Sequence, residues 1–132
     1  MTQHYHAIVW IDHHEARVFH FDEEGAERDV VLPQRPKAHI HHKANSIGSG
    51  HASEDQDFLH QATVAIRNAG AVLITGPGIE KHELIKHIER HDPQLMKRIT
   101  GVETVDHPTD GALVAHARKY FRAADRMRSQ RD

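Results

Sequence analysis

Histidine is the residue through which this chain could most directly do chemistry, since 15 of its 132 residues are histidine. An imidazole titrates near pH 6.5 and is the side chain that most often binds transition metals. On an extended segment His39 and His41 would point to the same side, and His51 could approach from a following glycine-bearing loop. Three imidazoles and a water would suit zinc, and nickel or copper would also accept them. The alternative is a solvated polar loop, and on that interpretation no cofactor is expected.

A second group of histidines lies in a segment with helical periodicity. His87 and His91 are four residues apart and would share one face of a helix, whereas His82 would lie about 140° away from His87. We interpret this group as part of a solvated helix face.

The tripeptide Gly76-Pro77-Gly78 has some features of a phosphate-binding loop. Glycines before a helix expose backbone amides and the positive end of the helix dipole to anions. The full spacing of a nucleotide-binding loop is absent and proline offers no N–H donor, so a tight turn between a strand and a helix is the better interpretation. Lys81 would fall in the first helical turn, where a cation is electrostatically unfavourable. We therefore predict that Lys81 meets RNA phosphate or an acidic neighbour.

Charge is distributed unevenly along the chain. Residues 12–29 hold seven acidic and two basic residues, whereas residues 33–51 hold three basic residues, four histidines and no acid. Residues 117–132 hold six basic residues against two acids. Blocks of opposite sign on one small domain indicate two distinct faces, and the basic one is a candidate for binding a polyanion; the alternative is a solvated surface with a basic tail. If the polyanion is RNA, phosphate contacts would be salt-sensitive and largely independent of nucleotide sequence. The residues that we then predict to contact it are Lys37, Lys43, Gly48, Gly50, His51, Lys81, Arg118, Lys119, Arg122 and Arg126.

Alternating strands and helices must position these residues. Apolar runs and alternating patterns predict the strands, and a capping box from Ser53 to Gln56 opens the first helix. The order β-β-β-(β)-α-β-α-β-α predicts an α/β fold with a mixed β-sheet and helices on its faces. The predicted strands cover 5–12, 16–21, 26–32, 71–75 and 99–105, with a short edge strand over 37–42, and the helices cover 53–69, 79–91 and the chain from about 109, with a further turn over 93–98. The residues that the second helix is expected to bury are Ile79, Leu84, Ile85 and Ile88.

The length predicts one domain over residues 1–132, with a core over about 5–125 and a basic tail over 126–132. The chain has no cysteine, which excludes disulfides and thiolate metal sites. It contains no leader pattern and no apolar run of about 18 residues, so we expect a cytoplasmic protein with no membrane partner.

Over about residues 5–125 the chain resembles the central domain of archaeal and eukaryotic peptide-chain release factors and of Pelota. That domain has the ribonuclease-H-like architecture of several translational machinery components, which the resemblance implies for this chain too. The motifs that carry the resemblance are Trp10-Ile11-Asp12 with Ala16-Arg17-Val18-Phe19, the basic loop His42 to Gly50 before a helix with Phe58, Leu73-Ile74-Thr75-Gly76-Pro77-Gly78 with Lys81 and Glu83, and Val102 to Asp106 with Gly111 and Leu113.

The resemblance implies a stand-alone, translation-associated module that contacts the ribosome, ribosomal RNA or tRNA. Release factors carry a Gly-Gly-Gln tripeptide where this chain has Gly48-Ser49-Gly50-His51, with no glutamine at the tip. Peptide release by that mechanism is therefore not expected, and the module is predicted to be non-catalytic. Two alternatives stay open. One is a histidine-rich metal-binding protein or metal-dependent hydrolase that uses His39, His41 and His51, and the other is an interaction protein whose acidic hairpin forms a homodimer or binds another partner.

Asp12 ends the first predicted strand, where nucleases of the ribonuclease H type place a metal-binding carboxylate. Such chemistry needs several carboxylates around two cations, and Asp106 is the one partner that the sequence offers. Two acids would bind a pair of cations poorly, so we do not predict nuclease activity.

Overall fold

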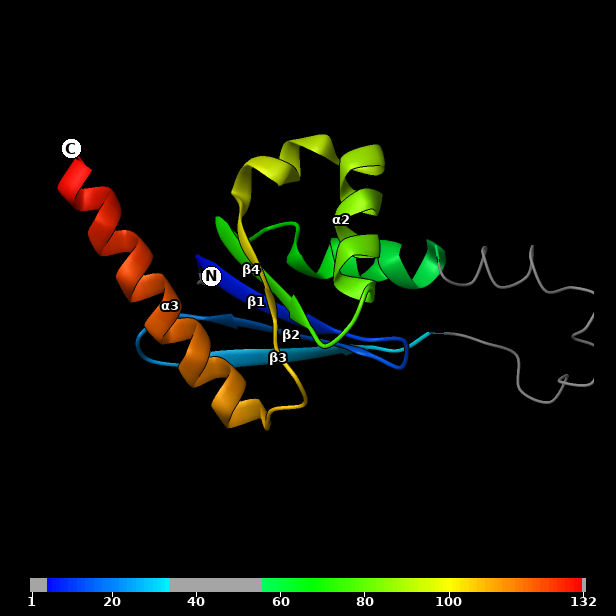
Figure 1. Ribbon diagram of the computed structural model, residues 1–132, viewed down its shortest axis with the longest axis horizontal. Coiled ribbons are helices and arrows are strands. Elements are labelled where there is room, and N and C mark those ends of the chain that lie inside the picture. The colour runs from blue at the N-terminus through cyan, green and yellow to red at the C-terminus, as the bar shows by residue number, and fades with distance from the viewer. Residues whose placement is uncertain (1–4, 34–55, 132) are drawn as a thin grey trace, which may run out of the picture.

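The structure of the protein is a computed structural model that describes residues 5–33 and 56–131 (Figure 1). Its elements follow the predicted order closely. The predicted edge strand over 37–42 and the helix cap Ser53 lie outside the described residues. The elements are β1 (His6–Ile11), β2 (Ala16–Phe21), β3 (Ala26–Val31), a helix over 56–66, β4 (Ala71–Gly76), α2 (Glu80–His91), the 3-10 helix η2 (Pro93–Arg98), β5 (Ile99–Thr104) and α3 (Asp110–Arg131).

Five strands form one mixed sheet in the order β3-β2-β1-β4-β5. β1, β2 and β3 pair antiparallel as a meander, whereas β4 pairs parallel with β1 and β5 pairs parallel with β4. Parallel neighbours need a crossover connection, and the helix over 56–66 and α2 supply the two that this sheet requires. The predicted α/β class with a mixed sheet is confirmed.

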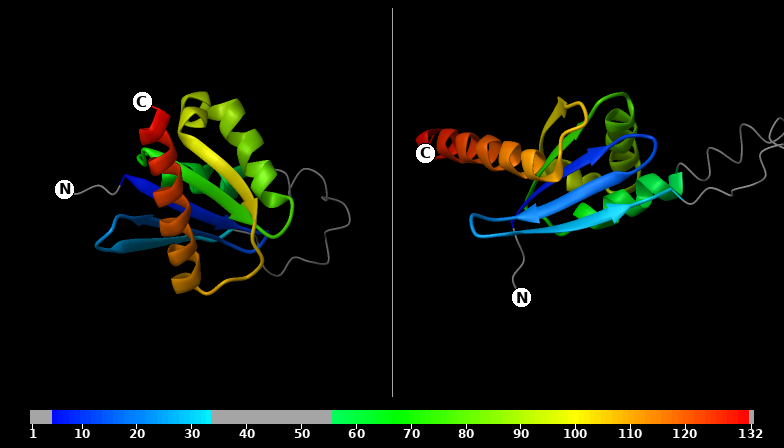
Figure 2. Two further views of the ribbon diagram at one scale, coloured as in Figure 1. Left: turned by 60° about the vertical axis from the view of Figure 1, so that its left-hand side comes forward. Right: turned by 90° about the horizontal axis from the view of Figure 1, so that it is seen from below.

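Helices cover both faces of the sheet (Figure 2). The helix over 56–66, α2 and η2 pack on one face, in a core that includes Ile74 and Leu84. α3 packs on the other face, in a core that includes Trp10 and Phe121. β4 is buried over its whole length, as predicted for a central strand with apolar packing on both sides.

One residue that we expected in the core is not there. Ile79 is 63% exposed, whereas Leu84 and Ile88 are fully buried and Ile85 packs partly against the core. Ile79 is the N-cap of α2. A cap residue precedes the helical turns, so its side chain need not follow the buried face of the helix.

The carboxyl ends of four strands lie at the same edge of the sheet, because β1, β3, β4 and β5 run in one direction. We call it the carboxyl edge. Asp12, the turn Gly76-Pro77-Gly78 and the segment 105–107 follow three of these strand ends directly. α3 runs from near this edge toward the opposite one, where Asp125 comes within 3.4 Å of His6 at the start of β1 (Figure 1).

Candidate functional site

The turn Gly76-Pro77-Gly78 carries β4 out of the sheet and into α2. A Cβ atom at Gly76 would lie 2.3 Å from the Ile11 carbonyl oxygen, so the absence of a side chain lets β4 approach β1 at this point. The Gly76 carbonyl accepts a hydrogen bond of 3.0 Å from the N–H of Val105, which fixes the chain beyond β5. A Cβ at Gly78 would meet no atom within 4 Å. The predicted strand-to-helix turn is therefore confirmed, and only its first glycine is required by packing.

Two charged residues at the start of α2 are buried. Lys81 is 4% exposed, and its ammonium donates a hydrogen bond of 2.5 Å to the Gly78 carbonyl. Glu80 is 6% exposed, and its carboxylate lies 3.0 Å from Nδ1 of His13 in the β1–β2 turn. The expectation that Lys81 contacts RNA phosphate is not supported, because the buried ammonium would have to leave its carbonyl partner to reach one.

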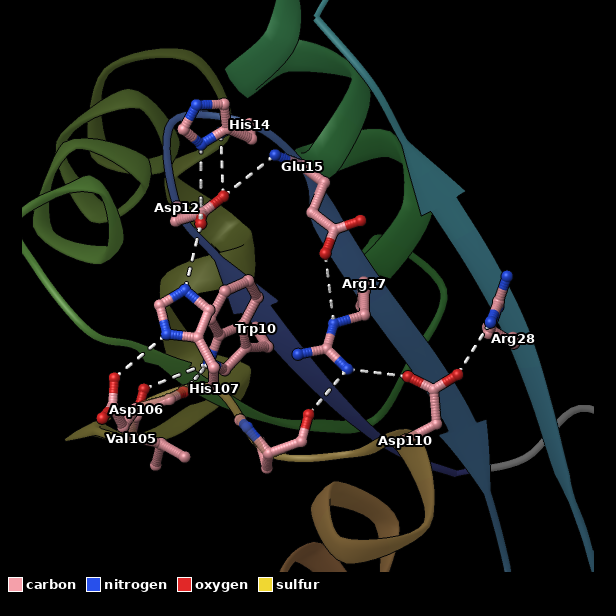
Figure 3. Close-up of polar contacts among 11 residues, drawn as sticks. Trp10, Asp12, His14, Glu15, Arg17, Arg28, Val105, Asp106, His107 and Asp110 are labelled. Carbon is pink, nitrogen blue, oxygen red and sulfur yellow. Dashed lines mark hydrogen bonds and ion pairs between the residues drawn. The ribbon is translucent and has the colours of Figure 1, made fainter.

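Trp10 connects β1 to the segment after β5 through its indole N–H (Figure 3). Its indole Nε1 lies 3.1 Å from the Val105 carbonyl oxygen and 2.7 Å from that of Asp106. The His107 ring packs edge-on against the indole, with 5.0 Å between ring centroids. These contacts hold the carboxyl edge together across residues far apart in the sequence.

Asp12 and Asp106 do come to the same edge, with His107 between them. Nε2 of His107 lies 3.6 Å from Asp12, and its Nδ1 lies 3.0 Å from Asp106. However, Oδ1 of Asp12 accepts hydrogen bonds from the N–H groups of His14 and Glu15, and so closes the β1–β2 turn. Within residues 5–33 and 56–131, no group of three or more histidines and acids is arranged to hold a metal ion. The arrangement at Asp12 is therefore that of a turn, and it gives no support to a two-metal nuclease site.

Arg17 links the sheet to the start of α3 (Figure 3). Its guanidinium lies over the Trp10 ring, 4.5 Å from the centroid, and its Nη1 donates to the Pro108 carbonyl at 3.1 Å and to Asp110 at 2.7 Å. Arg28 donates to the other carboxylate oxygen of Asp110, also at 2.7 Å. Hydrogen bonds from Arg17 and Arg28 hold the pKa of Asp110 below its ordinary value.

Four of the predicted RNA-binding residues lie together on α3. Their spacing places Arg118, Lys119, Arg122 and Arg126 within an arc of about 100° around the helix axis, and we call this arc the basic face of α3. Lys119, Arg122 and Arg126 are exposed, and none forms an ion pair with another described residue. Arg118 is half-buried and donates to the Asp22 carbonyl at 3.1 Å.

A cavity of about 340 Å³ adjoins the basic face of α3. Arg118 and Arg122 line it together with three acidic residues, Asp22, Glu23 and Asp125. Its charge is therefore mixed, and the cavity is not a ready-made site for an anion.

The other predicted site residues lie outside the described part of the chain. The segment 34–55 contains them, and the described residues on its two sides, Leu32 and Asp57, line one cavity beside the end of β3. The predicted RNA contacts of this segment and the predicted metal ligands stay predictions. These residues are Lys37, Lys43, Gly48, Gly50 and His51 for RNA, and His39, His41 and His51 for metal.

The histidines of α2 are not all solvated, and this part of the prediction is wrong. His87 is 6% exposed, and its ring centroid lies 4.4 Å from that of His91 and 5.9 Å from that of His60. Nδ1 of His87 lies 2.9 Å from Oε1 of Gln56, a residue for which the sequence predicted a capping role with Ser53. Local spacing does not reveal which helices pack together, so the contact of His60 with His87 is not predictable from it. The sequence does offer one signal for this contact. Gln56 and His60 are four residues apart, as His87 and His91 are, so each pair lies on one face of its helix.

Comparison with known proteins identifies the fold but no family. No family model and no curated protein matches the chain. Among solved structures, Pelota from Archaeoglobus fulgidus superimposes with a TM-score of 0.61 and 12% identity over 89% of this chain. The archaeal translation termination factor aRF1 gives a TM-score of 0.55 and 15% identity over 96% of the chain, and a further archaeal protein gives 0.56 and 16% over 96%.

This chain spans 32% to 39% of the length of those three proteins. At such low identity the likeness shows the fold alone. The predicted architecture, a mixed sheet with helices on its faces as in the release-factor and Pelota domain, is confirmed. None of the helices in the described ranges is long and apolar enough to cross a membrane.

Proposed function

We propose that the protein is a non-catalytic, translation-associated module that contacts ribosomal RNA or tRNA through exposed cations. Support comes from the fold, which the chain shares with part of Pelota and part of an archaeal translation termination factor. The observation that carries the proposal is the basic face of α3. Three of its four cations are exposed and have no ion-pair partner among the described residues.

Exposed cations without internal partners are suited to phosphate binding. An RNA phosphate that meets Lys119, Arg122 or Arg126 does not have to displace a carboxylate, and it releases condensed counterions when it binds. Guanidinium groups can also bind phosphate oxygens in pairs. Lys81 is not among the proposed contacts, because its ammonium is buried.

The basic residues of the segment 34–55 form a second proposed contact. Lys37, Lys43 and His51 belong to it by sequence. The described residues on either side of the segment lie at the carboxyl edge, whereas Arg126 lies at the far end of α3.

Co-sedimentation with ribosomes over a range of salt concentrations tests the proposal. We expect the full chain to pellet with ribosomes at low salt and to dissociate as salt rises. The double substitution Arg122→Gln with Arg126→Gln should reduce the slope of log affinity against log salt by roughly 1.5, because two phosphate contacts are lost.

A charge-matched control separates the basic face from net charge. Lys86→Gln with Lys97→Gln removes two exposed cations from α2 and η2, on the other face of the sheet. This control should bind ribosomes as the unchanged protein does. The proposal fails if the unchanged protein stays in the supernatant at low salt, or if the control weakens binding as much as the α3 double substitution.

A further inference from the structure

Two helices bring three histidine rings together on the face of the sheet opposite α3. His87 and His91 are one turn apart on α2, with ring centroids 4.4 Å apart. His60, on the helix over 56–66, lies with its ring centroid 5.9 Å from that of His87. None of these residues takes part in the proposed RNA contact.

The contacts of His87 determine which of its nitrogens is available. An amide oxygen only accepts hydrogen bonds, so Nδ1 of His87 carries the proton that is shared with Oε1 of Gln56, 2.9 Å away. The lone pair is then on Nε2. That atom is buried and has no hydrogen-bond partner among the described residues, although buried polar atoms are almost always paired. A histidine whose other nitrogen is fixed by a hydrogen bond is the usual form of a metal ligand.

Burial is the largest cause that lowers the pKa of His87, and the charges of His91, His60 and Arg90 add to it. The positive charge of Arg90 would also repel a cation bound at this ring.

We propose that His87 and His91 form a two-imidazole site for a divalent transition-metal ion, which His60 joins as a third ligand. Imidazoles four residues apart on a helix can bind one ion from the same face. As they stand, the three rings are not arranged around a common centre. His60 and His91 are exposed, so their side chains can turn toward Nε2 of His87 without opening the core. Water would complete the coordination of zinc, nickel or copper.

Titration of zinc chloride into the full chain, made without a histidine tag, tests the site. The protein used carries glutamine at the four histidines between residues 39 and 51, so that those residues cannot bind the metal. We expect this protein to bind one zinc ion, and His91→Gln to weaken the affinity at least about tenfold. His82→Gln, on the same helix but outside the cluster, is the matched control and should leave the affinity unchanged.

Two further substitutions act without removing a ligand. Gln56→Leu removes the acceptor that orients His87, and should weaken zinc binding by about tenfold or more. Arg90→Gln removes a neighbouring positive charge, and should strengthen it. Circular dichroism confirms that each variant is folded. His91 is exposed, so its substitution should not disturb the fold, whereas a substitution at the buried His87 could.

The proposal is overturned if no zinc, nickel or copper binds, or if His91→Gln and His82→Gln bind zinc equally well. It is also overturned if Gln56→Leu, folded as the unchanged protein is, binds zinc with unchanged affinity.

Discussion

At the carboxyl edge Lys81 is buried with its ammonium on the Gly78 carbonyl, whereas on α3 Lys119 is exposed and has no ion-pair partner among the described residues. The same contrast holds for arginine. Arg17 is bound to Asp110 and lies over Trp10, but Arg122 is exposed. Both regions are rich in cations, and only on α3 are the cations exposed without an ion-pair partner among the described residues.

The difference follows from the cost of removing a charge from water. A buried charge destabilises the fold unless a nearby group compensates it, so each buried cation of the carboxyl edge has an internal partner. An exposed charge has no such requirement and contributes little to stability. Substitutions at the carboxyl edge should therefore reduce stability and leave ribosome association unchanged. Substitutions on the basic face of α3 should weaken ribosome association and leave stability nearly unchanged.

The largest effect is expected from Gly76→Ala. Its new methyl group would stand 2.3 Å from the backbone oxygen of Ile11, which cannot move without separating β1 from β4. We expect a loss of about 3 kcal/mol or more in the free energy of unfolding, measured by urea denaturation. Gly78→Ala is the matched control, since its methyl group meets no atom within 4 Å, and it should change stability by less than about 1 kcal/mol. Equal losses in the two variants would contradict the role assigned to Gly76.

Trp10→Phe should have the next largest effect. It removes the indole N–H that lies within hydrogen-bond distance of the Val105 and Asp106 carbonyl oxygens, and leaves these part-buried contacts without their donor. We expect a loss of about 2 kcal/mol in the free energy of unfolding, from the lost hydrogen bonding and the smaller ring. Ribosome association of the folded variant should be unchanged. A variant as stable as the unchanged protein would show that the indole contacts of Trp10 do not stabilise the carboxyl edge.

The smallest effect is expected from Asp110→Asn, and it should depend on pH. The pKa of Asp110 is lowered in the folded protein, so its ion pairs add stability that is complete above its ordinary value of 3.8 and is lost as pH falls through the lowered pKa. Because the side chain is 37% exposed, solvent screening limits this contribution at neutral pH to less than about 1 kcal/mol.

Urea denaturation of both proteins at several pH values measures this difference. The gap in unfolding free energy between Asp110→Asn and the unchanged protein should narrow below pH 3.8. A gap that stays constant down to the most acidic pH at which both fold would rule out the ion pairs as its cause.

Local sequence patterns predict most of the secondary structure and the class of fold. The apolar run over 71–75 predicts a strand covered on both sides, and β4 is buried throughout. Gly76-Pro77-Gly78 predicts the turn that follows it, and the order of elements predicts the mixed sheet. These features depend on local spacing and backbone preference, which can be followed along the chain residue by residue.

The packing of separate elements determines which of the chemically active residues meet and which are exposed. Periodicity does not show that Lys81 turns its ammonium into the turn before α2, or that the helix over 56–66 brings His60 and Gln56 against His87. It also does not place Arg126 at the end of α3 that lies away from the carboxyl edge. Each of these outcomes depends on how separate elements pack, and residues distant in the sequence become neighbours only through that packing. The sequence therefore predicts a small α/β domain with abundant cations, and the packing of its elements determines which of them are exposed.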